Sequence, residues 1–234
     1  MGGAAWPGNA RRVGSVPRSG VGNFRRIAGP RAPLAATSSS ATFPSHDALD
    51  GAQAVKSLRG QLLISSGGLF DPNFRHTVVL IGEHNAEGAL GVVLNRPLDV
   101  TVADAIPPLA SLVDPGERLY QGGPVQPTSP VLLGHFSDPA RADLPVFGAV
   151  GFLIGEVEAA VADALERARV FAGYAGWGPG QLEQELAEDS WLVEAALAED
   201  VFTEDPDRLW HRVLQRKGPD FRHAAEIPFD PRTN

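Results

Sequence analysis

The 234-residue chain contains no cysteine. This absence excludes a disulfide framework, a thiolate metal site and a cysteine nucleophile. Long hydrophobic runs are missing as well. The longest apolar stretches, Val78 to Ile81 and Val150 to Ile154, have the length of strands, whereas a membrane span needs about 18 residues. We therefore expect a protein that does not act at a membrane and that is located in the cytoplasm.

Basic residues are scarce outside the first 50 positions. Those positions hold six arginines and two acids, whereas residues 51–234 hold 14 basic and 26 acidic side chains, a balance of −12. An acidic body repels a phosphate backbone, because nucleic-acid affinity comes largely from Lys and Arg. Direct DNA binding by the folded part is therefore not expected, and neither a helix-turn-helix pattern nor a basic helix is evident in the sequence.

The first 55 residues are rich in Gly, Pro, Ser and Arg and show no hydrophobic periodicity. We predict a disordered tail, because such a stretch cannot bury enough apolar surface to offset its ordering entropy. Three alternatives stay open: an organellar transit peptide, a twin-arginine export signal, and a start codon set too far upstream, with Val55 as an alternative initiator. Residues 219–234 are expected to form a loose C-terminal tail.

Residues 56–218 are predicted to fold as one compact α+β domain, with a largely antiparallel or mixed sheet flanked by helices. Two β-branched runs joined by a polar loop, residues 75–82 and 89–94, indicate an antiparallel hairpin. Further strands are expected at residues 60–65, 118–121, 130–136, 149–154, 170–174 and 190–193. Helices are expected at residues 102–106 (capped by Thr101), 156–169, 181–187 and 206–217.

Motifs that carry chemistry are missing or incomplete. The glycine-rich stretch at 173–180 lacks the spacing of a dinucleotide fingerprint and the Lys-Ser/Thr pair of a P-loop. We interpret it as a tight loop that packs Tyr174 and Trp177 on the sheet. The histidines form no metal signature, His84 is interpreted as part of a polar loop, and there is no Gly-x-Ser-x-Gly elbow. We therefore assign no catalytic residue, no metal ligand and no cofactor.

Polar residues around the hairpin are the remaining candidates. Arg96 follows a predicted strand and precedes Pro97, and from there its guanidinium can present a fork to a carboxylate or phosphate. The simpler alternative is an ion pair with a local acid such as Asp99. His76 alternates with Val78 on the preceding strand and is either part of a site or a strand-end residue. We name His76, Asn95 and Arg96 as speculative ligand-binding residues, although their distance in sequence does not show that they converge.

Several segments together resemble the YqgE/AlgH family. In chain order they are LRGQLLI at 58–64, DPNF at 71–74, TVVLIGEHNAEGALGVVLNRP at 77–97, QGGPV at 121–125 and GYAGWGPGQLEQEL at 173–186, followed by Trp191. The resemblance covers about residues 57–218 and implies a compact α+β fold in a cytoplasmic bacterial protein. It also carries a label of transcriptional regulator. It supplies no catalytic set that matches positions of this chain, so it implies a fold more than a function.

These features favour a non-enzymatic binding or regulatory module that acts through a protein partner or a small ligand. The first alternative is an enzyme or ligand-binding protein with a site near Asn95 and Arg96, which requires that these side chains meet in one concave place. The second alternative is a transcriptional regulator, as the label of the family suggests.

Overall fold

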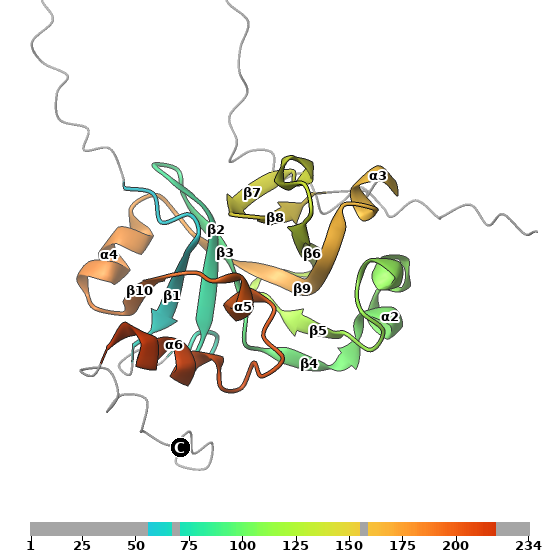
Figure 1. Ribbon diagram of the computed structural model, residues 1–234. Helices are drawn as coiled ribbons and strands as arrows, with labels where there is room; N and C mark the ends of the chain where they lie inside the picture. Colours follow the sequence, from blue (N-terminus) through green and yellow to red (C-terminus); the bar gives the residue numbers. More distant parts are fainter. Residues whose placement is uncertain (1–55, 67–70, 155–158, 219–234) are drawn as a thin grey trace, which may run out of the picture.

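The computed structural model describes residues 56–66, 71–154 and 159–218, which build a ten-stranded sheet with a few short helices (Figure 1). The strands are β1 (Gln61–Ser65), β2 (Val78–Asn85), β3 (Gly88–Val93), β4 (Pro97–Thr101), β5 (Arg118–Gln121), β6 (Val125–Phe136), β7 (Leu144–Phe147), β8 (Val150–Leu153), β9 (Leu165–Trp177) and β10 (Trp191–Ala195). The helices are α2 (Val102–Ala105), α3 (Ala159–Ala162), α4 (Gln181–Ala187), α5 (Ala198–Val201) and α6 (Leu209–Lys217), with 3₁₀ helices η2 (Pro107–Leu112) and η3 (Pro139–Arg141). The tails expected at 1–55 and 219–234 lie outside the described residues.

The sheet is mostly antiparallel. Along its main path the strands are ordered β10-β1-β2-β3-β9-β6-β8-β7, and β4 and β5 branch from β9. Among the described strands the single parallel pair is β5 with β9. The α+β class with a largely antiparallel sheet is therefore correct, with more strand than the sequence indicated. No helix of the described ranges is long and apolar enough to cross a membrane.

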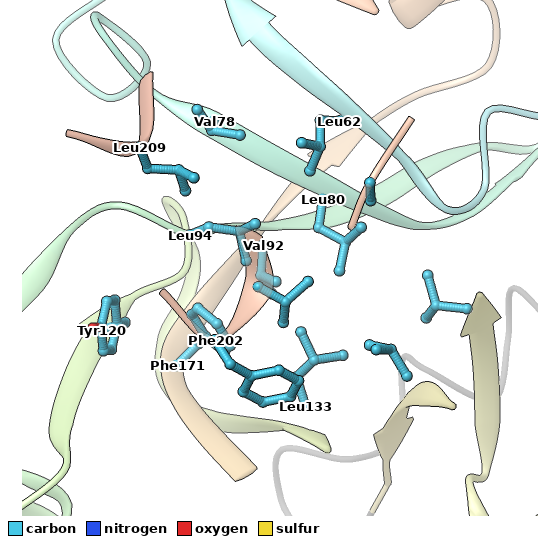
Figure 2. Packing of buried hydrophobic residues seen from close by; sticks show 14 of the residues in the cluster. Leu62, Val78, Leu80, Val92, Leu94, Tyr120, Leu133, Phe171, Phe202 and Leu209 are labelled. Carbon is cyan, nitrogen blue, oxygen red and sulfur yellow. The ribbon is translucent and has the colours of Figure 1, made fainter. Parts of the chain in front are cut away.

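The strands β1, β2 and β3 are buried on both faces. On one face Leu62, Leu80 and Val92 point towards Leu133 and Phe171 in the main core cluster (Figure 2). The opposite face packs under α4, in a cluster formed by Leu63, Val79, Ile81, Ala89, Val93, Ala175, Trp177, Leu182 and Trp191. Because both faces are covered, these strands are almost continuously apolar rather than alternating.

The prediction of a helix over residues 156–169 is wrong except for one short turn. Only α3 is helical there, residues 155–158 lie outside the described ranges, and from Leu165 onward the chain is the long strand β9. That strand pairs with β6 in a register that sets Leu133 opposite Arg169 and Val131 opposite Phe171. The apolar spacing that suggested a helix is therefore overridden by pairing with a distant strand.

The glycine-rich stretch is also different from the expected loop. Residues 173–177 continue β9, and the turn is confined to 178–180 before α4 begins. Gly173 has a φ of +70°, and a Cβ added there would lie 2.7 Å from the carbonyl oxygen of Val125. A Cβ on Gly122 would lie 2.1 Å from the carbonyl oxygen of Gly173. These glycines therefore allow two backbone segments to touch, a role that explains them without a phosphate.

Several local predictions are confirmed. β2 and β3 form the antiparallel hairpin, although its turn is only the two residues Ala86 and Glu87. Thr101 caps α2, and its Oγ1 accepts a hydrogen bond of 3.1 Å from the backbone N–H of Asp104. The last helix begins at Leu209 rather than 206, because a turn precedes it in which Asp205 accepts from the backbone N–H of Arg208.

Candidate functional site

A turn at residues 71–77 leads into β2 and is built by its own first residue. The Oδ1 of Asp71 accepts a hydrogen bond of 2.8 Å from the backbone N–H of Asn73 and another from the Asn73 side chain. The carbonyl of Asp71 accepts from the N–H groups of Phe74 and Arg75. Aspartate followed by proline favours this kind of turn, because the carboxylate can bind amides two residues later.

Asn95 fixes the end of this turn to the end of β3. Its Oδ1 accepts from the backbone N–H of Val78 at 2.9 Å, and its Nδ2 donates to the carbonyl of His76 at 2.9 Å. Between these two contacts Thr77 is bound to Ser65, whose Oγ accepts from the Thr77 N–H at 2.9 Å. His76 has a φ of +53°, which is uncommon for a residue with a Cβ. Asn95 therefore helps to hold His76 in an unfavourable backbone conformation.

Arg96, the residue after Asn95, also binds the turn. Its Nη2 donates to the carbonyl of Pro72 at 3.0 Å and to the carbonyl of Arg75 at 3.1 Å. Burial lowers the pKa of Arg96, and the Asp71 carboxylate acts in the opposite direction. The expected ion pair with Asp99 is wrong, because Asp99 accepts from Nη2 of Arg118 at 2.7 Å. The guanidinium of Arg96 binds backbone carbonyls of the turn instead.

The imidazole of His76 lies near basic side chains and against one aromatic ring. Its centroid is 4.5 Å from the ring of Trp210, which is buried and donates from Nε1 to the carbonyl of Ser65. Burial lowers the pKa of His76 first, and Arg75, His211 and Arg96 lower it further. We call the four side chains of Arg75, His76, Arg96 and His211 the basic cluster. Its two arginines bring positive charge to one place on a body whose overall charge is negative.

The structure thus brings the three predicted residues together, but it gives them different surroundings. Asn95 and Arg96 make hydrogen bonds to the chain's own backbone, so they position the turn. His76 stands beside them at the turn's end. Whether any of the three contacts a ligand remains a prediction.

A second polar centre, absent from the sequence prediction, links this turn to α4. The Oε2 of Glu185 accepts from the indole Nε1 of Trp177 at 2.9 Å and of Trp191 at 2.7 Å. Phe74 of the turn packs against both indoles, with centroid distances of 6.2 and 5.5 Å. One half-buried carboxylate acceptor therefore satisfies two tryptophans. The signal available in the sequence was a Trp eight residues before a helical Glu, which is too common to identify the contact.

His84 is a further residue that the sequence analysis misread. It lies in β2, buried, rather than in a polar loop. Its Nδ1 accepts from the backbone N–H of Leu58 at 3.1 Å, so Nε2 carries the proton and donates to Oε1 of Glu183 at 2.9 Å. Glu183 is 99 positions away in sequence, which is why the pair could not be read from the chain.

Two arginines and their acids are likewise engaged inside the fold. Arg169 is buried, bonds to Glu117 at 2.9 Å and donates to the carbonyls of Val201 and Thr203. Arg216 donates two hydrogen bonds to the fully buried carboxylate of Asp200. In the part of the chain that the structure describes, no group of three or more His, Asp or Glu side chains is arranged to hold a metal ion. The charged groups described here have a structural task.

Comparison with known proteins gives a consistent result. A family model described as AlgH-like matches residues 62–222. A UPF0301 protein of Streptomyces avermitilis is 42% identical over 195 residues, which cover 80% of this chain and all of that protein. A UPF0301 protein of Chlorobium limicola is 37% identical over 182 residues, 75% of this chain and 95% of the relative.

Two solved structures are also similar. The crystal structure of a protein from Corynebacterium diphtheriae superimposes with a TM-score of 0.65 at 29% identity, over 72% of this chain and 92% of that one. The solution structure of the AlgH protein from Pseudomonas aeruginosa gives a TM-score of 0.57 at 29% identity, over 75% and 97%.

Proposed function

We propose that this chain, which belongs to the AlgH-like family, is a cytoplasmic binding or regulatory module rather than an enzyme. It acts through a protein partner or a small ligand, which it recognises at the turn of residues 71–77. The bases of the proposal are the hydrogen bonds of the turn and the charge that the turn carries.

The main observation behind the proposal is what the side chains of Asn95 and Arg96 bind. Both are bound to backbone groups of the turn, at distances between 2.9 and 3.1 Å. A catalytic acid, base or nucleophile has to be directed at a reacting atom of a substrate. These two side chains are directed at the protein itself, which is the arrangement of a preorganised recognition loop. His84, Glu183, Glu185 and Arg169 are similarly occupied.

Charge supports recognition at this place. Residues 51–234 carry a balance of −12, yet the turn and the start of α6 bring Arg75, His76, Arg96 and His211 close to one another. A partner that carries negative charge is attracted here and repelled from the rest of the body. A long nucleic acid would also lie against the acidic surface beyond the cluster and be repelled there. This disfavours the alternative of a transcriptional regulator that binds DNA directly.

The second candidate is an enzyme in which His76 transfers a proton. One observation favours it: the strained backbone of His76, since strain of this kind gathers at functional sites. A neutral imidazole at neutral pH would suit a general base, and burial lowers the pKa of His76 in that direction. The candidate ranks second because the neighbours named for His76 are the basic side chains Arg75, His211 and Arg96, which suit recognition of a negatively charged group.

The test compares the molecules captured by the full-length wild-type protein with those captured by a full-length variant in which the charge at the turn is reversed. Immobilised wild type, Arg75→Glu/His211→Glu and the control Arg118→Glu are exposed to extracts of proteins and of metabolites, with thermal unfolding as the check on folding. Arg118 is exposed and pairs with Asp99 rather than with the turn, so Arg118→Glu is the control for charge reversal elsewhere on the surface. We expect a ligand or partner held by wild type and by Arg118→Glu and lost by the double variant. Capture that is equal for all three folded proteins contradicts the proposal.

A further inference from the structure

We infer that the basic cluster is a binding site for a small molecule that bears a compact oxyanion, of which a phosphate monoester is the chemical class that fits best. This inference deepens the proposed function, because it rests on recognition at the 71–77 turn and names what is recognised there.

The first argument is the fixed position of the charges. Arg96 is held by two carbonyls of the turn, and the carbonyls of His76 and Arg75 are themselves bonded to Asn95 and Arg96. The turn is closed at its other end by Asp71. Charges held in place before binding lose little conformational freedom when an anion arrives. The Arg96 guanidinium is therefore preorganised, and the backbone that carries Arg75 and His76 is fixed beside it.

The second argument concerns how Arg96 can act. Both of its hydrogen bonds to the turn leave from Nη2, and no other described residue accepts from its Nε or Nη1. The bidentate fork is thus already used, and Arg96 contributes a half-buried positive charge and at most single hydrogen bonds. Without the fork, an anion here is bound by single hydrogen bonds from several donors. A phosphate monoester offers three strong acceptor oxygens to such donors and a carboxylate only two, so the phosphate ester fits the cluster better.

The third argument is the low-dielectric wall behind the cluster. Trp210 is 2% exposed, and its ring lies 4.5 Å from the imidazole of His76 and 5.1 Å from that of His211. Water is excluded on that side, so attraction to an anion is less screened than on an open surface. The acid that acts on Arg96 is Asp71, an exposed residue whose Oδ1 already accepts two hydrogen bonds from Asn73.

A bound dianion would also change the state of His76. Arg75, Arg96 and His211 disfavour its protonation in the free protein. An anion placed among them offsets that repulsion, so protonation of His76 becomes easier when the site is filled. Binding is therefore coupled to proton uptake at one named side chain, and this coupling gives a readout that simple surface screening does not produce.

The experiment is a titration of the full-length protein followed by NMR signals of its histidine rings and tryptophan indoles. The probes are inorganic phosphate and glycerol 3-phosphate, with chloride at equal ionic strength as the reference. We expect saturable shifts of the His76 and Trp210 signals with both phosphates, and an upward displacement of the His76 titration. Arg75→Gln/His211→Gln should weaken binding about tenfold or more, because the charge of Arg75 and the imidazole donor of His211 are lost. Arg118→Gln should bind as wild type does.

The inference is overturned if phosphate and chloride give the same unsaturated shifts, or if the folded double variant binds phosphate as tightly as wild type. Saturation by inorganic phosphate but not by the ester also contradicts it, since the site would then hold a free ion rather than a small-molecule ester. These results are separate from those of the capture experiment. A partner lost on charge reversal without phosphate binding leaves the proposed function standing and removes only the ligand class.

Discussion

His76 and His84 lie near the two ends of β2, and the groups around them are opposite in charge. His84 is buried between a backbone N–H and the carboxylate of Glu183, so both of its ring nitrogens serve the fold. His76 lies in a strained turn beside Arg75, Arg96 and His211. The same residue type is thus a structural residue at one end of β2 and part of the basic cluster in the turn that precedes the other end. Neighbours supplied by the fold, rather than the residue itself, set the role.

Among variants at the two ends of β2, Asn95→Ala should lower the free energy of unfolding most. The change removes two hydrogen bonds and leaves the fully buried backbone N–H of Val78 without its acceptor. We expect a loss of about 2–4 kcal/mol in the free energy of unfolding, measured by urea denaturation. Asn85→Ala at the other end of β2 is the matched control. Its Oδ1 accepts only from the backbone N–H of Glu87 in the exposed hairpin turn, and we expect a loss below about 1 kcal/mol. Equal losses would mean that Asn95 does not hold the turn.

A somewhat smaller loss is expected for His84→Ala. The N–H of Leu58 loses its acceptor and Glu183 loses its donor, at a cost of about 1–3 kcal/mol. The amide of Leu58 should also exchange its hydrogen faster, which hydrogen-exchange NMR measures residue by residue. Glu183→Gln keeps an oxygen acceptor for Nε2 and should cost less. A loss for Glu183→Gln as large as for His84→Ala would show that the charge of Glu183, and not the hydrogen bond, stabilises this end.

The features that the sequence predicted correctly depend on residues that are close to one another along the chain. The cap at Thr101 depends on an amide three residues away, and the β2–β3 hairpin on a short turn between two apolar runs. The buried stripe of the last helix, Leu209, Trp210, Val213 and Leu214, follows from helical spacing alone. These features are local rules of the chain, and no distant residue competes with them.

What the sequence could not supply was decided by distant partners. β9 is a strand because β6 pairs with it, although its first residues have helical spacing. The partners of His84 and Arg169 lie 99 and 52 positions away. The candidate site is an intermediate case. His76, Asn95 and Arg96 were named from their chemistry, but their meeting depends on the register of β2 with β3, and the carbonyls that Arg96 binds come from a turn more than twenty residues earlier.

The acid sensitivity of the turn gives a third way to separate the two histidines. Burial, and after it the neighbouring Arg75, His211 and Arg96, lower the pKa of His76 below its ordinary value of 6.5. The unfolded chain therefore binds a proton at a higher pH than the folded protein does, and stability falls as the pH is lowered through 6.5 towards the folded pKa. His76→Asn removes the titrating group while keeping a residue that tolerates positive φ.

Stability of His76→Asn should therefore decline less than that of wild type between pH 7 and about pH 5, as measured by urea denaturation at each pH. Added salt should reduce the difference, because part of the effect comes from Arg75, His211 and Arg96. A variant that loses stability as steeply as wild type over this range would place the acid sensitivity elsewhere in the molecule.

The smallest effect should come from the charge pair beside His84. Arg59 and Glu83 approach to 3.8 Å, with side chains 35% and 25% exposed. A pair of this length near the surface is screened by water and salt, so Arg59→Ala should cost no more than about 0.5 kcal/mol, and less still at high salt. Glu83 adjoins His84 in sequence, yet the carboxylate that His84 binds is that of Glu183. A larger, salt-sensitive loss in Arg59→Ala would mean that this end of β2 depends on a charge network. A loss near zero would leave the bond of His84 to Glu183 as the polar contact that distinguishes it from the end at His76.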